Sequence, residues 1–199
     1  GNNRVVAKHN SPTKFAFFTD ATGNPLMVSA HFRAGGTQIY NSGTLSGTQP
    51  NAYSAETGHN LIRMGAYNYN LTAYFLQGFI AELFIFNTDL NTLERRIVEN
   101  YLGNKYGFTI PVDRYAYEAT HNVGIIGIGN NGFDSHSDSR GAGVLQVNNP
   151  TSNSSGDHMF IGHTNVDLDQ FTTTDLPASL PTHQRWTRTW RVDKTNDVG

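Results

Sequence analysis

Residues 78–107 read GFIAELFIFNTDLNTLERRIVENYLGNKYG, and this stretch decides the fold. Nearly every position in 79–86 is apolar, with Glu82 as the exception, which predicts a β-strand covered on both faces. Asn91 and Glu94 then have the spacing of a helix capping box, with Asn in place of the usual Ser or Thr. The stretch therefore predicts a buried strand, a short turn and a helix with a defined first residue.

The predicted helix carries one stripe of residues spaced three to four apart. The stripe consists of Leu93, Ile97, Val98, Tyr101, Leu102 and Lys105. This pattern predicts a helix of about four turns that packs one face on a sheet. Gly107 is a natural C-terminal cap, and Pro111 stops the chain from continuing as a helix.

The same stretch resembles the closing segment of the concanavalin A-like (laminin-G-like) jelly rolls of bacterial secreted proteins. There a strand of the form G-x-I-A-E-[apolar]-x-[apolar]-[FY]-N precedes a short helix with E-R and Y-L-x-x-K-Y-G. The matching positions are Gly78, Ile80, Ala81, Glu82, Leu83, Ile85, Phe86, Asn87, Glu94, Arg95, Tyr101, Leu102, Lys105, Tyr106 and Gly107. The resemblance implies an all-β jelly-roll sandwich with one amphipathic helix. That fold serves lectins, adhesins, glycanases and structural modules.

Further strands are predicted on both sides of this stretch. Residues 41–43, Asn-Ser-Gly, favour a hairpin turn, and polar loops are predicted in 46–60 and 66–76. The predicted strands are 15–18, 26–32, 37–40, 44–45, 61–65, 123–129, 144–147, 159–161 and 186–192.

A domain boundary is predicted near residues 108–113. Residues 1–110 are expected to form the C-terminal part of the jelly roll, in a window of a longer polypeptide, and residues 113–199 an accessory β-rich domain truncated at its C-terminus. The second part resembles a β domain that often follows such jelly rolls in secreted proteins of the Bacteroidota. The resemblance rests on 123–129, Ser135, Ser137, Ser139, 160–162 and 188–192. It implies export, for many such proteins through the type IX secretion system.

Composition narrows the classes of function. The 199 residues include no Cys, so disulfides and thiolate metal sites are excluded. Only 15% of the residues are charged and the net charge is −2, which is not the basic face of a nucleic-acid binder. No apolar run is long enough to span a membrane. An Asn-, Thr- and Gly-rich chain with many aromatics fits a secreted or cell-surface (extracellular) protein.

Aromatic and amide side chains gather in the predicted loop 66–76. Tyr67, Tyr69, Asn70 and Tyr74 are the ligand-binding candidates, because aromatic faces meet the C–H surfaces of sugars while amides fix hydroxyl groups. The alternative is that the tyrosines pack the rim of the sandwich.

Four aspartates are the candidate metal ligands. Asp134, Asp138, Asp167 and Asp169 lie in two short hydroxyl-rich loops, and carboxylate oxygens of this kind suit calcium. The alternative is that they are solvated turn carboxylates that cap their own backbone.

No catalytic pattern stands out. A glycosidase needs two carboxylates at one cleft, and Glu82 is the only acidic residue in its predicted strand. Residues 127–132 match G-x-G-x-x-G, but loop residues follow where a nucleotide-binding helix would begin. Trp186, Arg188 and Trp190 alternate in one predicted strand, either as core or as a contact surface.

The sequence thus favours a non-catalytic carbohydrate-binding or adhesive module of a large secreted bacterial protein. Its expected partner is an extracellular polysaccharide or surface glycan, with secretion-system or other surface proteins as further partners. One alternative is a structural spacer or type IX secretion cargo without a ligand of its own. Another is an ancillary module of a polysaccharide-degrading enzyme.

Overall fold

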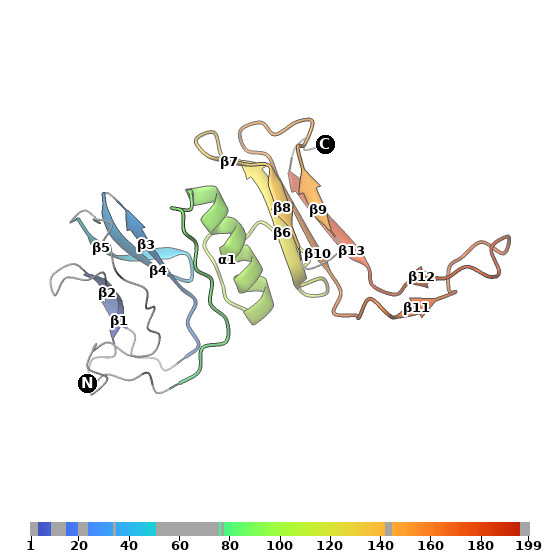
Figure 1. Cartoon of the computed structure of the whole chain (residues 1–199), viewed down its shortest axis with the longest axis horizontal. Helices are drawn as coiled ribbons and strands as arrows, with labels where there is room; N and C mark the ends of the chain where they lie inside the picture. The colour runs from blue at the N-terminus through green and yellow to red at the C-terminus, as the bar shows by residue number, and fades with distance from the viewer. Residues whose placement is uncertain are drawn as a thin grey trace.

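The chain was analysed as a computed structural model that describes residues 4–8, 15–19, 24–33, 35–50, 76, 78–141 and 145–195. The described part consists of antiparallel sheets and one helix, which confirms the mostly β class. Figure 1 shows helix α1 between two groups of strands, with a narrow arm projecting beyond the second group. The predicted strand 61–65 lies outside the described residues.

The strands before the helix form a three-stranded sheet with a hairpin packed on it. The hairpin meets the sheet through Ala7, Ala16 and Ile39, all of which are buried. The sheet has the order β3-β4-β5. The bounds are β1 Arg4–Lys8, β2 Phe15–Thr19, β3 Val28–Arg33, β4 Gly36–Asn41 and β5 Thr44–Gln49.

The predicted hairpin turn after β4 is confirmed. Ser42 and Gly43 have φ angles of 45° and 81°, and the tight turn of a twisted hairpin needs positive φ at both central residues. Strand β5 continues to Gln49, so the polar loop predicted from residue 46 starts later than expected. The side chains of Ser46 and Thr48 are exposed, which explains why this edge strand has the sequence of a loop.

Helix α1 spans Thr92–Tyr106 and has the predicted caps. The Asn91 side chain accepts a hydrogen bond from the Glu94 amide, and the Glu94 carboxylate accepts one from the Asn91 amide, both at 2.9 Å. Gly107 adopts the left-handed conformation with φ 71° and closes the last turn.

A second sheet lies on the other side of α1. Its strand order is β13-β10-β6-β7, and β8 and β9 form a small hairpin beside it. Tyr115, Ile125 and Phe160 are its buried core, and Ile97 and Tyr101 of the helix pack against them. The bounds are β6 Val123–Asn130, β7 Ser135–His136, β8 Asp138–Arg140, β9 Gln146–Asn148, β10 His158–His163 and β13 Trp190–Thr195.

The strand predicted in 79–86 does not pair with any strand of the described residues. Figure 1 shows this segment as a green trace that runs beside α1. Phe79 is fully exposed, and Ile80, Leu83 and Ile85 are about half exposed. The prediction of a buried strand was therefore wrong for the described structure, because a strand needs a neighbouring backbone that its own sequence does not supply.

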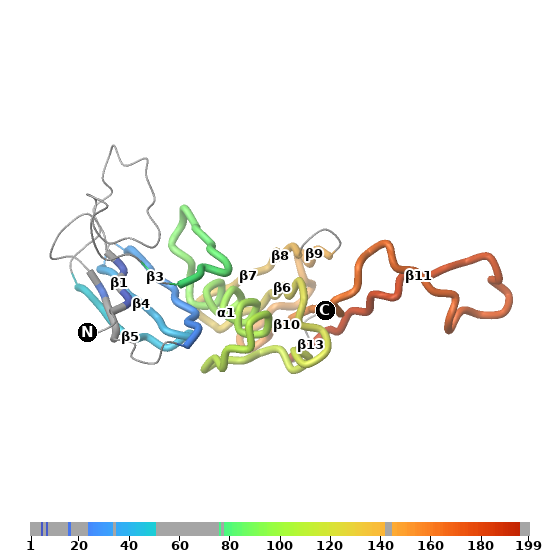
Figure 2. Tube along the Cα trace, turned by 90° about the horizontal axis from the view of Figure 1, so that it is seen from below, coloured from blue at the N-terminus to red at the C-terminus, as the bar shows by residue number. Residues whose placement is uncertain are grey.

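The arm consists of β11 (Phe171–Thr172) and β12 (Arg185–Trp186), which pair with each other. Figure 2 shows that the arm extends away from the sheets at the far end of the molecule. The single strand predicted in 186–192 is wrong, because residues 187–189 separate β12 from β13. Trp186 and Trp190 therefore belong to different strands, although their rings still lie 6.0 Å apart.

A cleft between helix α1 and strand β6

The described residues enclose a cleft of about 790 Å³ between α1 and β6. The helix contributes residues spaced three to four apart, which share one face. Glu94 and Lys105 mark the two ends of this wall, about 16 Å apart at the rise of an α-helix. The residues between them on the wall are Ile97, Val98 and Tyr101. We call this hollow the α1–β6 cleft.

The segment that follows residue 78 forms the aromatic wall. Phe84 and Phe86 lie two residues apart, and both line the cleft. Their ring planes differ by only 18°, with centroids 6.3 Å apart, and each side chain remains nearly half exposed. Tyr101 meets the Phe84 ring edge-on at 5.9 Å. The cleft therefore presents two nearly parallel aromatic faces.

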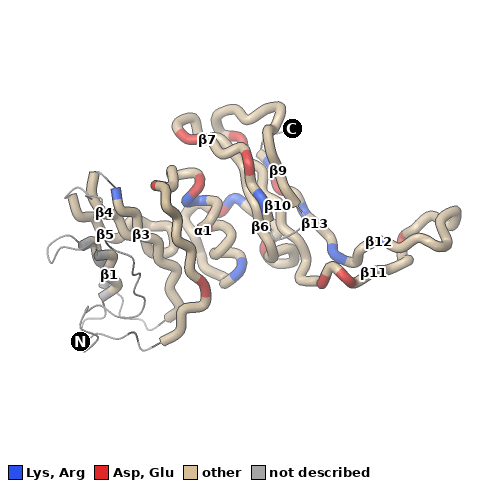
Figure 3. The backbone as a smooth tube through the Cα atoms, viewed as in Figure 1, with Lys and Arg blue, Asp and Glu red and all other residues tan. Residues whose placement is uncertain are grey.

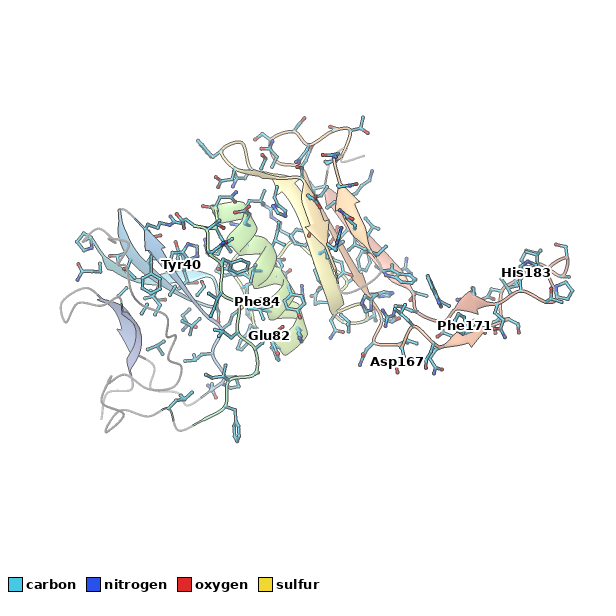
Figure 4. The ribbon with its side chains drawn as sticks, in the orientation of Figure 1. Tyr40, Glu82, Phe84, Asp167, Phe171 and His183 are labelled. Atoms are coloured by element: carbon cyan, nitrogen blue, oxygen red, sulfur yellow. The ribbon has the colours of Figure 1, made fainter. Side chains whose placement is uncertain are left out.

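Glu82 connects the aromatic wall to helix α1 through hydrogen bonds. Its carboxylate accepts hydrogen bonds from the Tyr101 hydroxyl (3.1 Å), the Lys105 ammonium (3.0 Å) and the Tyr106 hydroxyl (3.0 Å). In Figure 4, Glu82 and Phe84 both lie against α1. Burial raises the pKa of Glu82, but the hydrogen bonds from Lys105, Tyr106 and Tyr101 outweigh it and the net pKa is lowered. Hydrogen bonds to Tyr101 and Glu82 raise the pKa of Lys105, so both ends of the pair stay charged at neutral pH.

The opposite wall comes from β6 and the chain after it. Residues 122–126 line the cleft, together with His136, Ser139 and Arg140 of the following strands. His136 lies 3.5 Å from the Glu94 carboxylate across the upper end. The Thr92 amide, in the first turn of α1, donates to the Asp134 carboxylate at 3.2 Å. These contacts hold the helix start against the loop between β6 and β7.

The floor near the arm contains a histidine with a defined tautomer. His163 is buried, and its Nδ1 lies 2.8 Å from the Thr164 carbonyl oxygen. Because a carbonyl only accepts, we assign the proton of the neutral ring to Nδ1, which leaves Nε2 as an acceptor. Nε2 is directed at Gly124, where an added Cβ would lie only 2.5 Å away. Leu168 and Arg188, at the root of the arm, complete the floor.

Sequence reasoning missed this cleft. Its walls come from segments far apart in the chain, and the apolar stripe of α1 is the one local signal that pointed to it. The predicted sugar-binding residues Tyr67, Tyr69, Asn70 and Tyr74 lie outside the described residues. Their role stays a prediction.

The four candidate calcium ligands fall in two separate places. Asp134 accepts its hydrogen bonds from the start of α1 and from Asn131, and Asp138 accepts one from Gln146. Asp167 lies at the base of the arm, as Figure 4 shows, and Asp169 follows it in the same loop. Among the described residues no group of three or more His, Asp or Glu side chains is placed to hold a metal ion.

The chain matches no family model, no curated protein and no solved structure. Within the described residues, no helix has the length and apolar character needed to cross a membrane.

Proposed function

We propose that this chain is a non-catalytic carbohydrate-binding or adhesive module, and that the α1–β6 cleft is its binding site. The observation that carries the proposal is the pair of nearly parallel, half-exposed rings of Phe84 and Phe86 in one open cleft. Flat aromatic faces suit the C–H surfaces of sugar rings, and a half-wet site leaves the sugar hydroxyls free to find polar partners. The polar side chains that line the cleft, Ser139 and His163 among them, would supply such partners.

The acidic chemistry of the cleft supports binding rather than hydrolysis. Glu94 is the carboxylate that lines the cleft in the described part of the chain, and it is occupied as the helix cap and as the neighbour of His136. Hydrolysis of a glycosidic bond ordinarily uses two carboxylates on either side of that bond.

The proposal includes a specific assignment of the two halves of the chain to known kinds of domain. Residues 1–110 would be the C-terminal part of a concanavalin A-like jelly roll, and residues 113–199 an accessory β-rich domain. The capped helix after the 79–86 segment supports this assignment. The Asn-, Thr- and Gly-rich, charge-poor composition supports a place outside the cell, at the surface or in the medium. Type IX secretion in a member of the Bacteroidota is what the resemblance of the second half implies, and it is part of the same proposal.

A structural module is the second candidate, and one observation favours it. The apolar side chains Phe79, Ile80, Leu83 and Ile85 are exposed, and such a run is suited to a contact with another protein domain. In that case the 79–86 segment would be an interface, and the cleft would have no ligand of its own.

Glycan binding by the variant proteins tests the first candidate. A glycan array followed by affinity electrophoresis should show binding that weakens about tenfold in Phe84→Ala and in Phe86→Ala, since each variant removes one aromatic face. Phe133→Ala is the matched control, because Phe133 is 99% exposed and does not line the cleft. Urea unfolding of each variant separates lost binding from lost folding.

Two outcomes would contradict the assignment. If Tyr69→Ala and Tyr74→Ala abolish binding while the two Phe variants bind normally, the ligand lies on the predicted tyrosine loop instead of the cleft. If the folded protein binds no glycan on the array, the carbohydrate function is wrong and the structural candidate replaces it.

A further inference from the structure

We propose that the ligand of the α1–β6 cleft is an acidic glycan, one that carries carboxylate or sulfate groups along its chain. This inference rests on the proposed carbohydrate function and adds the charge of the sugar. It comes from the charged side chains that line the cleft, whose net charge is opposite in sign to that of the whole chain.

Cations outnumber acids in the cleft lining. Lys105, Arg140 and Arg188 line it, and Glu94 is the carboxylate that does so among the described residues. The whole chain carries a net charge of −2, so this local excess of positive charge runs against the overall balance. In Figure 3, basic positions appear on α1 and where β13 meets the arm. A cleft lined by one sign of charge concentrates ligands of the opposite sign.

The two arginines carry most of this excess, because neither has an acidic partner in the described part of the chain. Arg140 donates to the Gln146 side-chain oxygen at 2.8 Å, and Arg188 donates from Nε to the Val166 carbonyl at 2.6 Å. Both acceptors are neutral. Each guanidinium is thus held in place with donors to spare, and such donors match the two oxygens of a carboxylate or sulfate.

The other charged side chains at the cleft already have partners. The Lys105 ammonium lies 3.0 Å from the Glu82 carboxylate. Glu94 lies in the first turn of α1, where the helix dipole favours an anion, and His136 lies 3.5 Å from it. Arg140 and Arg188 are therefore the groups whose charge a ligand would have to balance.

Pairs of polysaccharides that share one sugar backbone and differ in charge test the effect of ligand charge on binding. Polygalacturonate and its fully methyl-esterified form share one sugar chain and differ in charge, and dextran sulfate and dextran form a second pair. We expect the native protein to bind at least one charged member about tenfold or more tightly than its neutral partner. The binding should weaken as NaCl is raised from 0.1 M to 1 M, since screening shortens the Debye length from about 10 Å to about 3 Å. The pair that shows the difference identifies carboxylate or sulfate as the recognised group.

Variants of the two arginines test whether the preference for a charged polymer depends on the cleft. Arg140→Gln and Arg188→Gln should each lose about tenfold in affinity for the charged polymer while binding to the neutral polymer is unchanged. Arg191→Gln is the matched control, because Arg191 is exposed over the Tyr117 ring and does not line the cleft. Equal binding of the charged and neutral members of both pairs would overturn the inference and leave the carbohydrate function standing.

A different class of ligand gives a different result. If polyglutamate binds as tightly as polygalacturonate and competes with it, the cleft recognises acidic polymers in general and the glycan part of the inference is wrong. If the folded protein binds none of these polymers and no glycan on the array, the proposed function itself fails. The three failures are therefore distinguishable from one another.

Discussion

Several side chains at the start of α1 serve two neighbours at once. Glu94 closes the capping box and also lies beside His136 of the second sheet. Asp134, from a loop 42 residues further along, accepts from the Thr92 amide. The start of the helix consequently contacts both neighbouring and distant parts of the chain. Single substitutions there should therefore change the free energy of unfolding by a measurable amount.

Asn91→Ala should lower the free energy of unfolding by about 1 kcal/mol, because the Glu94 amide loses its acceptor. Asn91→Asp keeps an acceptor oxygen and is the control, with an expected change close to zero. Urea unfolding followed by circular dichroism measures both. Equal stability of Asn91→Ala and the native chain would mean that water replaces the cap without loss.

Gly162 is a position where a single methyl group has no room. An added Cβ would lie 2.2 Å from the His121 carbonyl oxygen and 2.6 Å from the Tyr115 hydroxyl oxygen. Burial raises the pKa of that hydroxyl to about 12, and it donates to the His121 carbonyl at 3.1 Å. The close packing therefore involves a satisfied hydrogen bond, which an added methyl group would push apart.

Gly162→Ala should therefore destabilise the protein by about 1–3 kcal/mol. Gly35→Ala, where no atom lies within 4 Å of the added Cβ, should change stability by less than about 0.5 kcal/mol. Thermal and urea unfolding of the two variants, made side by side, provide the test. A Gly162→Ala protein as stable as Gly35→Ala would show that β10 shifts freely at this point.

At the scale of elements, α1 has two different faces. One face lines the cleft and packs on the second sheet. The other places Arg95 over the Tyr40 ring at 4.0 Å and in a hydrogen-bonded ion pair with Glu99. Both charged side chains are buried. Burial raises the pKa of Glu99, and the nearby Arg95 opposes that shift without overcoming it.

Removing one member of this pair should cost far more than neutralising the other. Arg95→Met leaves a buried carboxylate without its partner and should lower stability by about 3–5 kcal/mol. Glu99→Gln keeps a hydrogen-bond acceptor for Arg95 and should therefore lower stability by less than Arg95→Met does at pH 7. Unfolding midpoints in urea compare the two. A loss in Glu99→Gln as large as that in Arg95→Met would show that the Gln side chain does not replace the carboxylate as the acceptor for Arg95.

The sequence predicted the elements that depend on near neighbours. The capping box, Gly107 and the turn at Ser42 and Gly43 follow from local geometry, and all were confirmed. The three partners of Glu82 could not be predicted, because they lie 19 to 24 residues away. The strand expected in 79–86 failed for the same reason, since pairing depends on another segment.

On the scale of the whole molecule, buried histidines should set the response to acid. Burial lowers the pKa of His31, His121 and His158, with Arg33, Arg191 and Arg114 respectively as the next causes. The unfolded chain takes up protons near pH 6.5, while the folded chain does so only at lower pH. Stability is therefore lost as the pH falls from about 6.5 through these lowered pKa values.

We expect the urea midpoint to decrease steadily between pH 7 and pH 5, and His158→Gln to flatten the decrease. The raised pKa of Glu99 acts in the opposite sense, because the folded chain gains that proton first on acidification. The double variant His158→Gln/Glu99→Gln removes the contributions of His158 and Glu99 and leaves those of His31 and His121, and it serves as the reference. A midpoint that rises on acidification would show that Glu99 outweighs the three histidines.

The outer part of the arm should contribute nothing to the stability of the rest of the fold. Arg188 and Leu168 belong to the cleft, but residues 173–184 form turns at the far end, well away from the sheets in Figures 1 and 2. Replacing 173–184 by Asn-Gly, which suits a two-residue hairpin turn between Thr172 and Arg185, should leave the unfolding midpoint unchanged. A lowered midpoint would mean that the tip contributes to the folded core.

Helix α1 packs one face against each sheet. Unfolding of either sheet should therefore expose a face of the helix and weaken its packing on the other sheet. Tyr40 packs under Arg95 on one side of the helix, and Ile125 and Phe160 pack against Ile97 and Tyr101 on the other. The helix should therefore couple the unfolding of two regions that the sequence analysis assigns to separate domains. Differential scanning calorimetry would then record a single endotherm whose calorimetric and van't Hoff enthalpies agree.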